Sequence, residues 1–381
     1  MTPFTFHPGP KLLSGAGRSA ELADKLPRGP VLFVTDPDVR RFGLPDGLLA
    51  ALEASGRSVS LFDAVEADPS RATLLAAAEQ GRADAVVSVV GFGGGSPMDV
   101  AKLAAYLLGS DDDVDAIWGV GRALGTGLPL ALVPTTAGTG SEATPVAVIT
   151  VEGAEKRGVN SPALIAEWAV LDAELTIGKP RALTAATGID AIVHAVEAYT
   201  SARAKNPLSD LYAREALRLL GANLLTACDK PDDRDARSAM LLGAHLAGLA
   251  FANAPVAGVH ALAYPLGGLH HLPHGLSNAL MLRHVLAFNA EAAREHYAEL
   301  AEVLEPGCAG QGSQARAALL IERLAELITG SGLQPRLRDH GIAFDEAPRL
   351  AFEAMKQQRL LMNNPVEIRE EDARRLYEAA W

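Results

Sequence analysis

The fold of this chain is decided by residues 84–102, which read DAVVSVVGFGGGSPMDVAK. The run from Asp84 to Gly91 is mostly apolar and rich in β-branched side chains, which predicts a buried strand. The glycines that follow let the backbone turn and approach a ligand closely, and the helix that opens next offers free N–H groups to a pyrophosphate. The stretch therefore predicts the strand–turn–helix unit of a nucleotide-binding sheet. Its glycines do not fit the common G-x-G-x-x-G spacing, so alone the signal is weak.

Further strands on both sides of this unit alternate with helices rich in alanine and leucine. The clearest strands are Val31–Thr35, Val59–Phe62, Ala85–Val90 and Leu130–Val133. Such alternation predicts a mainly parallel sheet with helices on both faces, in three layers. A strand over Val146–Val151, followed by a turn at Glu152-Gly153, predicts a hairpin at the edge of that sheet.

After Pro180 the pattern becomes helical almost throughout, as in Asp210–Leu225, Glu291–Leu304 and Ser313–Gly330. A chain of 381 residues is long enough for two domains that each bury a sizeable core. We therefore expect an α/β dinucleotide-binding domain over residues 1–178 and an all-helical metal-binding and substrate domain over residues 179–381.

Two other segments place polar residues after apolar strands. In residues 132–142, LVPTTAGTGSE, small hydroxyl side chains alternate with glycine, which suits contacts to phosphate, ribose or amide groups as well as it suits an ordinary capped turn. Asp36 ends the strand that begins at Val31. A carboxylate there would accept hydrogen bonds from the adenosine ribose and repel a 2′-phosphate, or it would cap the turn through Pro37. Both interpretations stay open for each segment.

Four residues in the second half have the chemistry of one metal site. Asp190 and His194 are four residues apart in a helix-favouring stretch, so their side chains stand about 6 Å apart along the helix axis and can reach one ion. His260 and His274 supply two more imidazoles. One carboxylate with three imidazoles suits ferrous iron or zinc better than calcium or magnesium. Each histidine alone is more often a core residue, but the four residues together predict a metal.

The chain resembles the iron-containing (group III) alcohol dehydrogenases from its first strand to its last residues. The motifs that carry the resemblance lie at 93–102 (GGGSPMDVAK), 134–142 (PTTAGTGSE), 188–197 (GIDAIVHAVE), around His260, at 273–275 (PHG) and at 362–365 (MNNP). Their number and order make the resemblance specific. It implies the architecture shared with dehydroquinate synthase: an α/β dinucleotide-binding domain followed by a helical metal domain.

The resemblance also implies a role for each matching residue. The metal ligands would be Asp190, His194, His260 and His274, holding Fe²⁺, with Zn²⁺ as the alternative. The contacts to NAD would be Asp36, Gly94, Gly95, Ser96, Asp99, Thr135, Thr136, Thr139 and Lys156. The metal would act as a Lewis acid on the alcohol oxygen while hydride passes to the nicotinamide.

One position departs from the family pattern. Many members carry a second histidine one helical turn after the third ligand, often proposed as a proton relay, where this chain has Tyr264. Tyr264 should face the same cavity as His260, because the two are four residues apart. His271 is a second candidate for proton release. Packing alone is an equally good interpretation of Tyr264.

Composition narrows the class of partner. A formal charge of −12 argues against nucleic acid and against anionic membrane surfaces. Two cysteines, Cys228 and Cys308, give no disulfide framework and fit a reducing cytoplasm. The apolar run from Ala239 to Gly258 is interrupted by polar residues and proline, which predicts a buried core helix rather than a membrane span.

Three functions compete at this stage. The first is an NAD-dependent, metal-containing alcohol dehydrogenase acting on a small alcohol or carbonyl compound, which the resemblance implies to be a homodimer or larger homo-oligomer. The second is a cyclising lyase like dehydroquinate synthase, which needs a basic pocket, yet residues 255–285 contain only Arg283 besides histidines. The third is a metal-free reductase or binding protein on the same fold, which would not need all four ligands.

Overall fold

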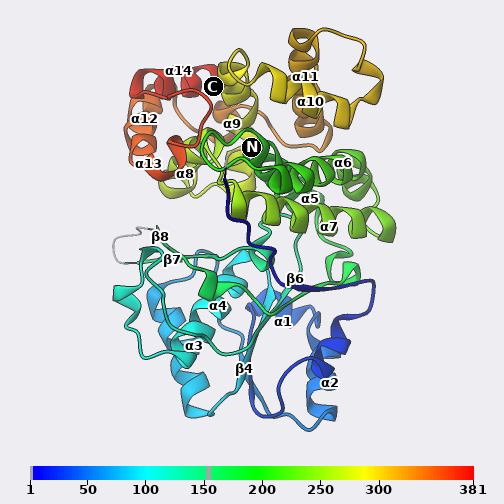
Figure 1. Cartoon of the computed structure of the whole chain (residues 1–381), viewed down its shortest axis with the longest axis vertical. Coiled ribbons are helices and arrows are strands. Elements are labelled where there is room, and N and C mark those ends of the chain that lie inside the picture. Colours follow the sequence, from blue (N-terminus) through cyan, green and yellow to red (C-terminus); the bar gives the residue numbers. More distant parts are fainter. Residues whose placement is uncertain (1–2, 152–155) are drawn as a thin grey trace. The chain divides into compact units, whose positions relative to one another are not determined.

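The computed structural model describes residues 3–151 and 156–381. They form two compact units, one over His7–Ile177 and one over Gly178–Trp381 that also includes the chain up to Phe6. Phe6 joins the second unit by stacking on Tyr212, with ring centroids 5.8 Å apart. Figure 1 shows a strand-containing unit and a helical unit. The predicted turn at Glu152-Gly153 lies outside the described residues.

The first unit contains a sheet of six strands in which every neighbouring pair is parallel, as predicted. In spatial order the strands are β1 (Lys11–Ser14), β9 (Trp168–Leu171), β6 (Leu130–Pro134), β4 (Ser88–Gly93), β2 (Val31–Val34) and β3 (Val59–Phe62). The helices of this unit are α1 (Pro37–Arg41), α2 (Asp46–Ala54), α3 (Arg71–Ala83) and α4 (Gly95–Gly109).

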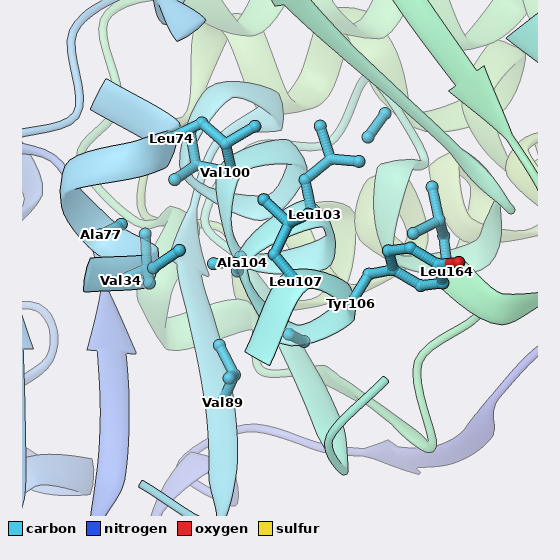
Figure 2. Packing of buried hydrophobic residues seen from close by; sticks show 14 of the residues in the cluster. Val34, Leu74, Ala77, Val89, Val100, Leu103, Ala104, Tyr106, Leu107 and Leu164 are labelled. Carbon is cyan, nitrogen blue, oxygen red and sulfur yellow. The ribbon is translucent and has the colours of Figure 1, made fainter. Parts of the chain in front are cut away.

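Side chains alternate between the two faces of the sheet and so create two cores. Leu32 and Val34 pack with α3 and α4, whereas Val31 and Phe33 pack with α2. Figure 2 shows Ala104 of α4 beside Val34 of β2, within the buried cluster that also contains Val89 and Leu103. Because both faces are covered, the strands read as continuous apolar runs rather than as alternating ones, which is typical of parallel sheets.

The order of the strands marks a place for a ligand. From β2 the chain passes to β3 on one side, and it then returns past β2 to β4 on the other side. Such a reversal opens a crevice outside the carboxyl ends of β2 and β4, the kind of place where ligands of open α/β sheets bind. Here those ends are followed by Asp36 and by the glycine turn at 93–95.

Two details of the predicted sheet are wrong. Strand β4 begins at Ser88 rather than at Ala85, because residues 84–87 form the turn after α3 and Ala85 has a left-handed φ of 47°. The hairpin of β7 (Val146–Thr150) and β8 (Lys156–Asn160) pairs with β5 (Gly119–Val120) in a separate sheet of three strands. The hairpin does not extend the main sheet. Its buried residues Ala147, Ile149 and Val159 instead belong to the core cluster that contains the buried residues of α4.

The second unit is helical in the part that the structure describes. Its helices are α5 (Arg181–Thr200), α6 (Pro207–Asp229), α7 (Arg234–Asn253), α8 (Gly258–His270), α9 (His274–Asn289), α10 (Arg294–Leu304), α11 (Ser313–Gly330), α12 (Ala347–Met355), α13 (Gln358–Leu361) and α14 (Glu370–Ala380). Helix α5 packs against α6, α7 and α9, and nearly all of its residues from Thr184 onward are buried. A polar residue on α5 is therefore held in the interior and needs a partner there.

Among the described residues, no single helix is both long and apolar enough to cross a membrane. Helices α7 and α8 meet that requirement only as a pair, and a bend of 107° separates them.

Candidate metal and nucleotide sites

Three helices of the second unit bring the four predicted metal ligands together. Helix α5 carries Asp190 and His194, α8 carries His260, and α9 begins at His274. One ligand atom from each residue lies within 4.8 Å of all the others. Oδ1 of Asp190 is the common neighbour, 3.9, 3.8 and 3.5 Å from Nε2 of His194, His260 and His274.

The donor set fits a cation. Asp190, His194 and His260 are buried, and only the His274 side chain is substantially exposed, at 44%. Burial raises the pKa of Asp190, but the three histidines and a hydrogen bond from Asn278 more than offset this, so its pKa is lowered overall. A buried carboxylate facing three imidazole nitrogens satisfies its charge best with a positive ion between the donors.

A second carboxylate, Glu197, fixes the orientation of His260. Its Oε2 is 2.7 Å from Nδ1 of His260, and the same carboxylate accepts hydrogen bonds from the backbone N–H groups of Ala257 (3.0 Å) and Val259 (2.6 Å). Since a carboxylate accepts and an unprotonated ring nitrogen cannot donate, Nδ1 of His260 carries the hydrogen. The lone pair of Nε2 then faces Asp190, which is the usual arrangement behind a metal-binding histidine.

We expect Glu197→Gln to weaken metal binding by about tenfold or more, because partners of this kind typically account for 10- to 100-fold in affinity. The measurement is competition between the protein and a chelator for a divalent metal. Glu299→Gln is the matched control, since Glu299 accepts a hydrogen bond from Tyr199 in the same unit and touches no predicted ligand. Equal affinities in wild type and Glu197→Gln would contradict this role.

Close backbone packing places His274. A Cβ on Gly275 would lie 2.1 Å from the carbonyl oxygen of Ala186 and 3.3 Å from Cβ of Asp190. No other residue fits there without moving α9 away from α5. The glycine of the Pro-His-Gly motif therefore lets the first turn of α9 approach the helix that carries two of the predicted ligands.

The Met-Asn-Asn-Pro motif supports the start of α8. Nδ2 of Asn363 donates to the carbonyl of Val256 (3.0 Å), and Asn364 exchanges two side-chain hydrogen bonds with Asn289 (2.8 and 2.9 Å). A Cβ on Gly258 would lie 2.6 Å from Oδ1 of Asn364. These contacts hold the segment that leads into His260, so we infer that the motif supports the metal cluster from outside.

A pocket of about 400 Å³ lies at the crevice that the strand order predicts. Three segments line it: residues 36–38 after β2, residues 65–67 after β3, and residues 94–97 after β4. The pocket thus contains the predicted cofactor contacts Asp36, Gly94, Gly95 and Ser96. Helix α4 begins here with Gly94 at its N-cap and without a side-chain cap, so its first N–H groups are available to a phosphate.

The second predicted loop lies against the glycine turn. A Cβ on Gly95 would be 3.1 Å from Cγ2 of Thr139, and one on Gly94 would be 3.8 Å from Oγ1 of Thr136. The N–H of Thr135 donates to the carbonyl of Gly93 (2.8 Å), while the Thr135 hydroxyl is buried and has no hydrogen-bond partner among the described residues. The two loops thus form one glycine-rich surface, and the missing side chains let a ligand approach the protein backbone closely.

Asp36 caps α1 and also lines the pocket. Its Oδ1 accepts a hydrogen bond from the N–H of Val39 (2.8 Å), which confirms the capping interpretation. Its Oδ2 faces Gly93: a Cβ added to Gly93 would lie 3.1 Å from this oxygen. The two interpretations are compatible, because the cap occupies one carboxylate oxygen and leaves the other beside the pocket.

Comparison with known proteins decides the family. The family of iron-containing alcohol dehydrogenases matches residues 9–173, and the C-terminal domain of the Fe-containing alcohol dehydrogenase family matches residues 184–381. The chain belongs to the iron-containing alcohol dehydrogenases. The predicted resemblance is therefore confirmed, and this dehydrogenase is an oxidoreductase. The parallel sheet followed by a helical unit confirms the predicted fold class.

Individual relatives match along the whole chain. Long-chain-alcohol dehydrogenase 1 of Geobacillus thermodenitrificans is 39% identical over 357 residues, which cover 92% of this dehydrogenase and 89% of the relative. The crystal structure of a 1,3-propanediol oxidoreductase superposes with a TM-score of 0.96 at 33% identity, covering 100% of both chains. The sulfoacetaldehyde reductase of Bifidobacterium kashiwanohense, solved in complex with NAD⁺, gives a TM-score of 0.89 at 28% identity, covering 100% of this chain and 99% of the reductase.

Among the predicted cofactor contacts in the dehydrogenase, Asp99 and Lys156 also have polar side-chain partners within the protein. Asp99 accepts hydrogen bonds from the Ser141 hydroxyl (2.7 Å) and the Val148 N–H (2.9 Å), and burial raises its pKa. Nearby Lys102 is fully buried, and this burial lowers its pKa to about 8. Lys156 is exposed and pairs with Asp68 at 2.6 Å. Asp99 therefore holds the second loop to α4, and the roles of Asp99 and Lys156 toward NAD stay predictions.

The two candidates for proton release lie in different surroundings. Tyr264 is half-buried on α8, and its ring centroid is 5.9 Å from that of His274, one of the predicted metal ligands. His271 is exposed and closes α8 in a left-handed conformation, with a φ of 55°. Sequence reasoning did not find Glu197 or Asn278, although both follow a predicted ligand on the same helix by three or four residues.

Proposed function

We propose that this chain is an NAD-dependent dehydrogenase that interconverts a small-molecule alcohol and its aldehyde or ketone at a divalent metal, with ferrous iron preferred over zinc. The observation that carries the proposal is the convergence of four donors from three helices, with Asp190 at their centre. The metal would be held by Asp190, His194, His260 and His274. When bound, it supplies Lewis-acid polarisation of the substrate oxygen.

The residues of the chain have separate tasks in this proposal. Glu197 sets the tautomer of His260, so that Nε2 is ready to bind without releasing a proton. Gly94, Gly95 and the first turn of α4 would receive the pyrophosphate, and Asp36 would accept hydrogen bonds from the adenosine ribose. Four protein donors favour iron because an open position for substrate then requires five or six partners, which tetrahedral zinc sites do not provide.

Matches over both halves of the chain support the dehydrogenase rather than the lyase. The names of the relatives cover unlike substrates: long-chain alcohols, 1,3-propanediol and sulfoacetaldehyde. We also propose that the protein is cytoplasmic, because its two buried cysteines are free, as is usual in a reducing compartment. From the family resemblance we propose that it is a homodimer or a larger homo-oligomer. Size-exclusion chromatography with light scattering tests the oligomeric state, and a monomer would refute it.

The proposed function is tested by metal analysis combined with kinetics. Protein purified with and without added Fe²⁺ or Zn²⁺ is assayed for NADH formation with a series of primary alcohols, diols and secondary alcohols. We expect one metal per chain and activity that depends on the metal. Full activity in a verified metal-free preparation, or no alcohol-dependent NADH formation by the metal-loaded protein, would refute the proposal.

Tyr264 is expected to shape the substrate side of the metal cluster rather than to transfer the proton itself. A phenol with a reference pKa near 10 is a poor general base at neutral pH, and loss of a true acid–base group costs about 100- to 10,000-fold in rate. Tyr264→Phe should therefore keep kcat within about tenfold of the wild type. His271→Ala is measured beside it. A loss of several orders of magnitude in Tyr264→Phe would make the tyrosine the relay, and the same loss in His271→Ala alone would assign that task to His271.

A further inference from the structure

Asn278 lies among the predicted metal ligands without being one of them. Its Nδ2 is 2.6 Å from Oδ1 of Asp190, 3.2 Å from Nε2 of His260 and 3.3 Å from Nε2 of His274. The side chain is fully buried on α9, four residues after His274. Residues i and i+4 share one face of a helix, so the amide enters the cluster beside that histidine.

The chemistry of the amide explains this position. The NH₂ group of asparagine donates hydrogen bonds, whereas a carboxylate and an unprotonated imidazole nitrogen accept them. With two hydrogens, Nδ2 can donate to at most two of these three acceptors, and the lone pairs of both Nε2 atoms are the ones that would bind a metal. The contact to Oδ1 of Asp190 is compatible with a bound metal, because a carboxylate oxygen has a second lone pair. Oδ1 of Asn278 itself has no hydrogen-bond partner among the described residues. The contacts made by Nδ2 are therefore the polar contacts that orient the amide within the cluster.

The shortest of these contacts goes to the atom on which the cluster is centred. Oδ1 of Asp190 is the oxygen that lies within 3.9 Å of one nitrogen of each of the three histidines. A hydrogen bond to that oxygen restricts rotation of the carboxylate. Glu197 has the corresponding relation to His260, so two of the three most buried ligands are held by a polar group outside the ligand set.

We propose that Asn278 is a positioning residue of the metal centre: its amide aims the Asp190 carboxylate at the three imidazoles. This inference rests on the proposed function, because it concerns the same metal site. Hydrogen bonds that orient metal ligands typically account for 10- to 100-fold in metal affinity. Removing the amide should therefore weaken metal binding by about that factor while every ligand remains in the chain.

The test compares Asn278→Leu and Asn278→Ala with the wild type. Leucine has the branched shape of asparagine but cannot donate a hydrogen bond, so it separates hydrogen bonding from packing. We measure the dissociation constant of Co²⁺ by competition with a chelator, and the visible spectrum of the Co²⁺-loaded protein. Both variants should bind Co²⁺ about 10- to 100-fold more weakly and give an altered spectrum, because the geometry of the Asp190 oxygen changes.

Ser277→Ala is the matched control. Ser277 is as buried as Asn278 and lies next to it on α9, but its hydroxyl donates to the carbonyl of Pro273. This control should keep the wild-type affinity and spectrum. Wild-type affinity together with a wild-type spectrum in Asn278→Leu would overturn the proposal.

A double-mutant cycle keeps the test decisive if the leucine variant does not fold. If Asn278 acts through Asp190, then Asn278→Ala should add little further loss of Co²⁺ affinity in an Asp190→Asn background. Additive losses would show that Asn278 acts independently of Asp190 and would refute the positioning role. Failure of the wild type to bind any divalent metal would instead refute the proposed function, so the two failures are distinguishable.

Discussion

Replacing His260 with alanine is expected to abolish alcohol-dependent NADH formation and to empty the metal site, while NAD still binds. The change removes one of four converging donors and leaves the buried Glu197 carboxylate without its imidazole partner. Metal polarisation of a substrate oxygen contributes several kcal/mol to catalysis, so kcat should fall by about a thousandfold or more. The predicted NAD contacts belong to the other unit, over His7–Ile177, and should be unaffected.

The measurements are metal content by elemental analysis, steady-state kinetics and NAD binding by calorimetry. His284→Ala is the matched control, because His284 lies on α9 in the same unit but outside the metal-ligand cluster. It should retain metal and activity. An active His260→Ala enzyme, or one that keeps its full metal content, would show that the cluster is not the catalytic centre.

Replacing Asp36 with glycine is expected to lower the ratio of kcat/KM with NAD to kcat/KM with NADP by about 100-fold. The change removes a negative charge that would repel a 2′-phosphate, and it removes the acceptor for the ribose hydroxyls, a charged hydrogen bond worth roughly 1.5–3 kcal/mol. Asp36 stands at the carboxyl end of β2, opposite the turn where α4 begins, so it lines the pocket that the proposed cofactor would enter.

Two further variants isolate the charge. Asp36→Asn keeps an oxygen that can cap α1, so a similar narrowing in this variant would assign the effect to charge rather than to a displaced turn. Asp38→Asn should change the preference far less, because Asp38 lies in the same pocket but pairs with Arg41 at 2.9 Å and is 74% exposed. Equal use of NAD and NADP by the wild type would show that the role given to Asp36 is wrong.

Periodicity predicted the elements whose burial repeats regularly. Val59–Phe62 and Ser313–Gly330 were predicted with the bounds that the structure has. Periodicity gave a wrong prediction where a turn carries apolar residues. Val86 and Val87 resemble strand residues, but they belong to the turn after α3. The hairpin of β7 and β8 was recognised, but its sheet was not, because alternation along a strand does not reveal its neighbours.

The candidate sites show a similar division. Spacing and residue type were enough to group the four predicted metal ligands, since i and i+4 positions on a helix must share a face. Asn278 was missed because an amide in an apolar helix has no distinctive pattern, and its partners come from other helices. Asp99 was grouped with the NAD contacts by motif, and this role stays a prediction; the structure adds that its carboxylate accepts hydrogen bonds from Ser141 and from the backbone of β7. A motif shows that residues belong together, but not which of them touch the ligand.

The two roles of Asp36, the observed helix cap and the proposed contact to the coenzyme, have a consequence for evolution. A helix N-cap accepts asparagine, serine or glycine nearly as well as aspartate, so the start of α1 tolerates the loss of this charge. Asparagine and glycine are each a single base change away from an aspartate codon. On the proposed role of Asp36, coenzyme preference can therefore change at this position through neighbouring sequences that all fold. Gly275 offers no such route, because any side chain there would meet the backbone of α5. Lineages that keep this architecture should vary in coenzyme preference more readily than in the way they hold their metal.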